Sequence, residues 1–178
     1  TYTTQNSMLL ENLLKFYKKD NNMDTMLNII NGQSTISLRI VDWFVTNYAK
    51  KHFTIYEFNG DRFKVYNDYK NKLRAYSKKR FDPFCRWDRI SIPFKNDTHI
   101  QTTIGQLNFF KWAIENDVIK YIQNNYQCIE KDMNLRNSAS NRETIATTNK
   151  TRKKREELSI SASKSIKKED VEIVLKFN

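Results

Sequence analysis

The sequence predicts an α+β fold, with a mostly helical core around one long helix in the C-terminal half, one or two β-hairpins and a C-terminal strand. Three observations lead to this prediction. Apolar residues recur every three or four positions over residues 104–135, which is the spacing of one helix face. Two short regions alternate apolar and polar residues around turn sequences, as hairpins do. Only 3 Gly and 2 Pro occur in 178 residues, so few breaks interrupt the helices.

The first part of the chain predicts three helices, over residues 6–19, 23–31 and 35–51. Ser7 is a candidate N-cap of the first, because a serine hydroxyl can accept a hydrogen bond from a free N–H group at a helix start. Ser34 or Ser37 is the candidate for the third. Gly32 suits the end of the second helix, since glycine tolerates positive φ.

Two hairpins are expected next. Residues 53–58 and 62–66 alternate around Asn59-Gly60, a strong two-residue hairpin turn. Residues 89–94 and 98–103 form the second candidate, in which Pro93 indicates an edge strand because proline cannot donate to a sheet ladder.

Between the hairpins, the spacing of Tyr66, Tyr69, Leu73 and Tyr76 predicts a helix. Cationic side chains crowd around this stripe: Lys70, Lys72, Arg74, Lys78, Lys79 and Arg80. Interleaved tyrosines and cations can bind a nucleic-acid backbone by stacking and charge. An amphipathic helix with a basic solvent face is the alternative interpretation. After it, residues 80–89 predict a loop anchored in the core by three aromatic residues, Phe81, Phe84 and Trp87.

The long helix is expected to begin at a capping box formed by Thr103 and Gln106. Asn116-Asp117 and Asn124-Asn125 are weak helix formers at which it can bend or break. Its apolar face is wider than a surface helix needs, so we expect it to be buried. Together these elements predict a globular domain over residues 1–136.

After residue 136 the composition changes. Residues 137–154 are predicted to be a polar and basic linker, and residues 155–178 a C-terminal arm. Residues 171–177 alternate as a strand, which we expect to pair with a sheet edge. A second candidate polyanion-binding cluster lies at the end of the linker and consists of Arg152, Lys153, Lys154 and Arg155.

The net charge of +11, with a pI near 9.6, favours nucleic acid, anionic lipid or acidic protein as partner. No P-loop, dinucleotide fingerprint or nucleophile elbow occurs. Cys85 and Cys128 have no CxxC partner, and His52 and His99 lack metal-ligand spacing. We therefore expect no catalytic residues, metal, cofactor or small-molecule substrate. No apolar run approaches the ~20 residues of a membrane span.

Three segments together resemble a conserved uncharacterised protein family of the nucleocytoplasmic large DNA viruses of algae and protists. They are residues 38–51, 76–86 and 102–122. The resemblance implies a virion or virus-factory protein made in the host cytoplasm. We expect a minor capsid protein that bridges capsomers, or the shell and an inner membrane, with the major capsid protein and other viral structural proteins as partners. The alternative is a nucleic-acid-binding protein packaged in the virion or acting in viral transcription.

Overall fold

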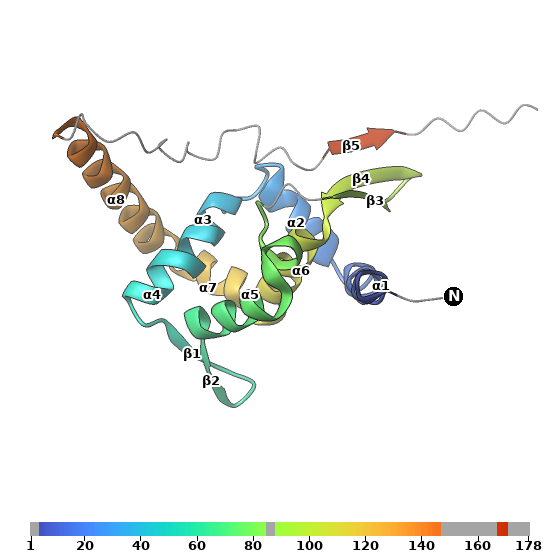
Figure 1. Ribbon diagram of the computed structural model, residues 1–178, viewed down its shortest axis with the longest axis horizontal. Helices are drawn as coiled ribbons and strands as arrows, with labels where there is room; N and C mark the ends of the chain where they lie inside the picture. The colour runs from blue at the N-terminus through green and yellow to red at the C-terminus, as the bar shows by residue number, and fades with distance from the viewer. Residues whose placement is uncertain (1–3, 85–87, 147–166, 171–178) are drawn as a thin grey trace, which may run out of the picture.

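The computed structural model describes residues 4–84, 88–146 and 167–170, and it has the predicted α+β fold (Figure 1). The helices are α1 (Gln5–Tyr17), α2 (Asn22–Ile30), α3 (Leu38–Trp43), the π-helical turn η1 (Phe44–Tyr48), α4 (Ala49–Lys51), α5 (Val65–Phe81), α6 (Ile104–Glu115), α7 (Val118–Asn124) and α8 (Tyr126–Ala146). The strands are β1 (Ile55–Phe58), β2 (Asp61–Lys64), β3 (Arg89–Pro93), β4 (Thr98–Thr103) and β5 (Lys167–Asp170).

The N-cap residues of α3 and α6 are ones that the sequence predicted, whereas the N-cap of α1 is a different residue. Ser37 caps α3, its hydroxyl accepting a hydrogen bond from Ile40 N–H at 3.3 Å. Thr103 caps α6 in the same way, accepting from Gln106 N–H at 3.2 Å. The N-cap of α1 is Thr4 and not Ser7, because the extended backbone at Thr4 lets its hydroxyl accept from Ser7 N–H.

The region expected to be one long helix consists of three helices, which break at both asparagine pairs. The side chain of Asn116 donates to the carbonyl of Trp112 at 2.8 Å, and that of Asn125 donates to the carbonyl of Tyr121 at 2.9 Å. Each side-chain amide thus hydrogen-bonds to a carbonyl in the last turn of the helix before it. Such side-chain bonds compete with the backbone bonds that would continue the helix, so the helix ends there. Asp117 then adopts a left-handed backbone, with φ of 55°. The chain thus changes direction twice while keeping its apolar residues inside.

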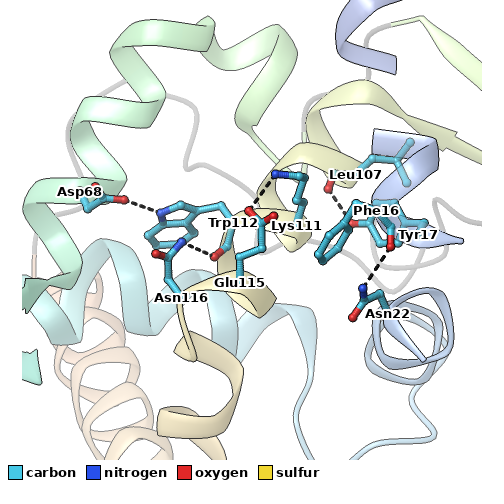
Figure 2. A network of polar contacts seen from close by, with 9 residues as sticks. All are labelled: Phe16, Tyr17, Asn22, Asp68, Leu107, Lys111, Trp112, Glu115 and Asn116. Carbon is cyan, nitrogen blue, oxygen red and sulfur yellow. Dashed lines mark hydrogen bonds and ion pairs between the residues drawn. The ribbon is translucent and has the colours of Figure 1, made fainter. Parts of the chain in front are cut away.

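Helix α6 is the centre of the core, as the sequence predicts. Five of its apolar residues are no more than 3% exposed, namely Leu107, Phe109, Phe110, Trp112 and Ala113. Tyr17 of α1 donates from its hydroxyl to the carbonyl of Leu107 at 2.6 Å (Figure 2). Burial raises the pKa of this tyrosine well above its ordinary value. Even the polar side chains Gln106 and Asn108 are buried on this helix.

Two small antiparallel sheets flank the helices. The β1–β2 hairpin turns through Asn59 and Gly60, both with positive φ, as a type I′ turn requires. The other sheet has the order β3-β4-β5, so Pro93 lies on an edge strand as predicted. Strand β5 pairs with the outer side of β4, Thr98 opposite Asp170 and Gln101 opposite Lys167. The strand predicted over residues 171–177 lies outside the described residues.

Helix α8 continues to Ala146, so residues 137–146, predicted as part of a linker, are helical. No Gly or Pro occurs there, and extending a formed helix fixes one residue for each new hydrogen bond. Its C-terminal part extends away from the other helices at the upper left of Figure 1. The rest of the linker and the cluster Arg152–Arg155 lie outside the described residues. No helix in the described ranges has the length and apolar character to cross a bilayer.

Candidate polyanion-binding surface

Helix α5 carries the cations that the sequence singles out, and α6 holds it in place. The indole N–H of Trp112 donates to the Asp68 carboxylate at 2.6 Å near the start of α5 (Figure 2). At the other end, the side-chain amide of Asn108 donates to the carbonyl of Arg80 at 2.8 Å. Between them, Tyr69 packs against the ring of Trp112. Both ends of α5 are thus fixed to the most buried helix of the protein.

Gly105 allows the close approach of α6 to the end of α5. A Cβ atom at this position would lie 2.8 Å from the carbonyl oxygen of Asp82 and 3.0 Å from that of Lys79. These neighbours are backbone atoms, which cannot move aside without shifting the helix end. Glycine is therefore required at position 105 because a side chain would clash with these backbone atoms, and not because of its backbone φ angle.

A kink at Ser77 divides α5. Its backbone has φ of 63° and ψ of 167°, a conformation that glycine adopts but that strains other residues. The kink lets Phe81 point back into the core, where it is fully buried and packs against Phe109 and Trp112. It also redirects the last turn, which carries the final three cations.

The six predicted cations of α5 fall into two groups: Lys70, Lys72 and Arg74 precede the kink at Ser77, and Lys78, Lys79 and Arg80 follow it. Arg74, Lys78 and Lys79 are exposed, whereas Lys70, Lys72 and Arg80 are half-buried. Lys70 and Arg74 are one turn apart, and Lys72 lies at the opposite border of the buried stripe. The guanidinium of Arg80 donates to the side chain of Gln5 at 3.4 Å.

Most of this charge is unneutralised. Within the described part of the chain, four of the six form no ion pair: Lys70, Lys72, Arg74 and Lys78. The two nearby acids bind neutral donors instead. Asp68 accepts from the Trp112 indole, and Asp82 accepts from Phe84 N–H at 2.9 Å. The two carboxylates thus accept from groups of the fold, and Lys70, Lys72, Arg74 and Lys78 are left without an ion pair among the described residues.

A hollow of about 290 Å³ lies at the start of α5, and it was not predicted from the sequence. Residues from α4, the β1–β2 hairpin and α5 line it, namely Ala49, Lys50, Phe53, Thr54, Ile55, Lys64, Tyr66 and Asn67. The alternating pattern of residues 53–58 predicted a strand, but pairing reaches only Ile55, and Phe53 belongs to the helix end before it. The signal in the sequence that could have indicated this turn is the lack of a glycine after His52, where α4 ends.

A different charge cluster joins α3 and α4 to α8. Asp132 accepts from the Trp43 indole at 3.1 Å and from Lys51 at 3.0 Å, and His52 and Arg136 lie within 4 Å. Burial alone would raise the pKa of Asp132, but hydrogen bonds from Lys51 and Trp43, with the charges of Lys51 and Arg136, outweigh it and lower the pKa. Here Lys51 and Arg136 share one carboxylate, so their charge is partly neutralised.

Among the described residues, no three His, Cys, Asp or Glu side chains are arranged to hold a metal ion. Cys128 is a free, exposed thiol on α8, and Cys85 lies outside the described ranges. Lys70, Lys72, Arg74 and Lys78, which form no ion pair with a described residue, offer a surface for an anion, and the hollow lies at the start of the same helix.

Residues 1–176 match a family of unknown function, DUF7197. The chain belongs to that family. It is 46% identical over 142 residues to the uncharacterized protein L507 of Acanthamoeba polyphaga mimivirus. The alignment covers 74% of this chain and 55% of that protein, so the chain spans about half the length of the relative. No solved structure matches significantly. The resemblance to an uncharacterised giant-virus protein is thus confirmed.

Proposed function

We propose that this DUF7197 protein binds nucleic acid through the basic surface of α5, in the virion or virus factory of a large DNA virus. The observation that carries the proposal is that Lys70, Lys72, Arg74 and Lys78 have no ion pair among the described residues. Charges of one sign held together repel each other, and a polyanion relieves that repulsion.

The shape of the surface supports nucleic acid as the polyanion. The part of α5 before the kink at Ser77 is about 18 Å long. Duplex DNA carries one charge per ~1.7 Å of its axis, so such a helix meets several phosphates at once. Each phosphate contact releases condensed counterions, which makes binding strongly salt-dependent. The proposal is a binding role, with the phosphate backbone as the group recognised.

The test is the salt dependence of DNA binding, measured by fluorescence anisotropy on the triple variant Lys70→Gln, Lys72→Gln and Arg74→Gln. A matched control removes the same charge elsewhere, through Lys19→Gln in the turn after α1, Lys120→Gln on α7 and Lys131→Gln on α8. These three lysines are exposed and also form no ion pair with a described residue. We expect the slope of log K against log[salt] to fall by roughly 2 to 3 in the α5 variant and to change far less in the control.

Two results would reject the proposal. One is the absence of DNA binding by the unmodified protein even at low salt. The other is an equal loss in both triple variants, which would show that only the net charge matters. Both variants must first show the same cooperative thermal unfolding as the unmodified protein.

The second candidate is a minor capsid protein, and one observation favours it. Strand β5, from the C-terminal part of the chain, adds to the edge of β4. The same addition to the sheet of a neighbouring subunit would supply backbone hydrogen bonds without a deep pocket. The major capsid protein and other viral structural proteins would be the partners, and +11 would suit an acidic shell or an anionic inner membrane.

Fractionation of purified virions separates the two candidates. A capsid protein stays with empty shells after the genome is released, in a fixed ratio to the major capsid protein. A nucleic-acid-binding protein leaves with the genome fraction and is released from it by salt.

A further inference from the structure

Phe53 occupies a position where a helix normally ends in glycine. Helix α4 ends at Lys51, His52 is its C-cap, and Phe53 follows with φ of 47°. Thr54 N–H then donates to the carbonyl of Ala49 at 3.1 Å, which is the longer bond of a Schellman motif. The left-handed position of this motif favours glycine, because a Cβ atom is strained there.

Packing does not explain the phenylalanine either. Its side chain is 83% exposed, the largest exposure among the large hydrophobic residues of the described chain that face solvent. Neither the backbone nor the core thus accounts for an aromatic ring at position 53. Phe53 and Ile55 both line the hollow and are both exposed, so together they offer an apolar surface to another molecule.

The hollow beside Phe53 has an apolar wall and a cationic rim. Ile55 lines it and is 47% exposed, and it lies directly across the hairpin from Lys64. The ammonium group of Lys50 lies 5.7 Å from the ring centroid of Tyr66, which also lines the hollow. Neither lysine forms an ion pair with a described residue.

These features fit a flat, partly apolar group that is joined to negative charge. The hollow is at the small end of the range for ligand pockets, which suits one ring system and not a large ligand. The cations continue from this rim along α5, so the negative charge of the ligand must extend beyond the hollow. A nucleic-acid strand has both properties, with a base on each sugar and a phosphate between neighbours.

We propose that the hollow takes an unpaired base of single-stranded nucleic acid, stacked against Phe53, while Lys50 and Lys64 hold the adjacent phosphates. The inference rests on the proposed function and names its substrate class. A duplex keeps its bases paired and stacked inside the helix, so it can offer the phosphates to α5 but no base to the hollow. The protein therefore binds single strands more tightly than duplexes of equal phosphate number.

The experiment measures the affinity of the full chain for three probes of equal phosphate number: a single-stranded oligonucleotide, its duplex form and an abasic single strand. Phe53→Gly removes the ring and suits the left-handed backbone, so the variant folds. We expect it to lose roughly 5- to 150-fold in affinity for the single strand, the range of one base–aromatic stack, and little for the other two probes. Phe53→Tyr keeps the stack and should bind as the unmodified protein does.

Leu135→Ala is the matched control, because Leu135 is also apolar and 62% exposed but lies on α8, away from α5. It should change none of the three affinities.

If Phe53→Gly leaves single-strand binding intact while the α5 triple variant weakens all probes, the base-binding inference is wrong and the proposed function stands. If no probe binds the unmodified protein, the proposed function fails. If an acidic peptide with an aromatic residue binds in a Phe53-dependent way and the single strand does not, the hollow is a peptide site and the inference is overturned.

Discussion

Two basic regions of this protein use their charge in opposite ways. Around Asp132, Lys51 and Trp43 donate to one carboxylate that is only 10% exposed, and Arg136 also stacks over the Trp43 ring. On α5, the cations outnumber the acids six to one, and the one acid, Asp68, binds an indole. The first region connects two parts of the fold, and in the second four of the six cations form no ion pair with a described residue.

The difference shows what net charge alone conceals. A total of +11 says nothing about which lysines are available to a partner. The carboxylates decide it, because a lysine beside a half-buried acid is already neutralised, whereas one beside a neutral donor is not. On this criterion we expect α5 to be a binding surface and the Asp132 cluster to be a structural joint. Each prediction below tests one side of that distinction.

The largest effect is expected from Trp112→Ala, which removes the side chain that anchors α5 to the core. Trp112 is 3% exposed and packs against Tyr69, Phe81 and Phe109. We expect the free energy of unfolding to fall by ~3–5 kcal/mol, the usual cost of deleting a buried aromatic side chain. Chemical denaturation followed by tryptophan fluorescence and circular dichroism measures it.

Trp112→Phe separates the packing from the hydrogen bond. It keeps most of the aromatic contact but removes the donor to Asp68, and we expect a loss of ~1–3 kcal/mol. A loss below ~1 kcal/mol in both variants would mean that α6 is peripheral and that α5 is held by other contacts.

The next effect concerns the Asp132 joint. Asp132→Ala leaves the Trp43 indole without its acceptor and frees Lys51 and Arg136, so we expect the protein to lose about 1–3 kcal/mol of stability. Lys19→Gln, at an exposed lysine with no described ion pair, should stay within about 0.5 kcal/mol. Equal effects of the two substitutions would contradict the structural role of Asp132.

The pH dependence of the Asp132 contribution follows from the direction of its shift. Its pKa is lowered in the folded protein, so the folded state favours the ionised carboxylate. The contribution is therefore complete above the unfolded pKa of about 3.9 and is lost as pH falls through the folded value. The stability difference between the protein and Asp132→Asn should be constant above pH ~5 and shrink below pH ~4. A difference that persists unchanged at the acidic end would contradict the charge pairing.

The sequence predicted the fold well where the pattern is local. Hydrophobic spacing located the helices, Asn59-Gly60 the first hairpin, and Thr103 the start of α6. It misjudged the long helix, because the spacing of apolar residues continues across two breaks. Those breaks depend on whether the side chains of Asn116 and Asn125 bind the preceding turn, which the pattern alone does not reveal.

The candidate site was predictable only in part. The cations of α5 are visible in the sequence as a run. That four of them, Lys70, Lys72, Arg74 and Lys78, form no ion pair with a described residue depends on Asp68 and Asp82 binding other donors, which only the tertiary structure shows. The hollow depends on the turn at Phe53, where local pattern favoured a strand. The site we propose thus lies where the local rule failed, at a bulky residue in a left-handed position.

A smaller effect is expected at the kink of α5. Ser77 has φ of 63° and ψ of 167°, which strains any residue with a Cβ atom. Ser77→Gly should relieve that strain, and after the entropy that glycine loses on folding we expect a net gain of about 1 kcal/mol. Ser77→Ala keeps the Cβ atom and should not gain. A loss in the glycine variant would mean that the Ser77 side chain stabilises the kink.

The smallest effect separates the two basic regions most clearly. Lys70 and Arg74 are one helical turn apart with the same charge and no described acid beside them, and such pairs destabilise a helix by about 0.2–0.5 kcal/mol. The double variant Lys70→Gln and Arg74→Gln should therefore leave the protein as stable as before or slightly more stable. The comparison is Lys51→Gln, which removes a partner of Asp132 and should cost stability.

Thermal unfolding at low salt and again at high salt measures the stability of both variants. Salt screens the repulsion on α5, so the gain of the double variant should disappear at high salt. If the double variant instead loses as much as Lys51→Gln, the α5 cations hold the fold, and their charge is not free for a partner.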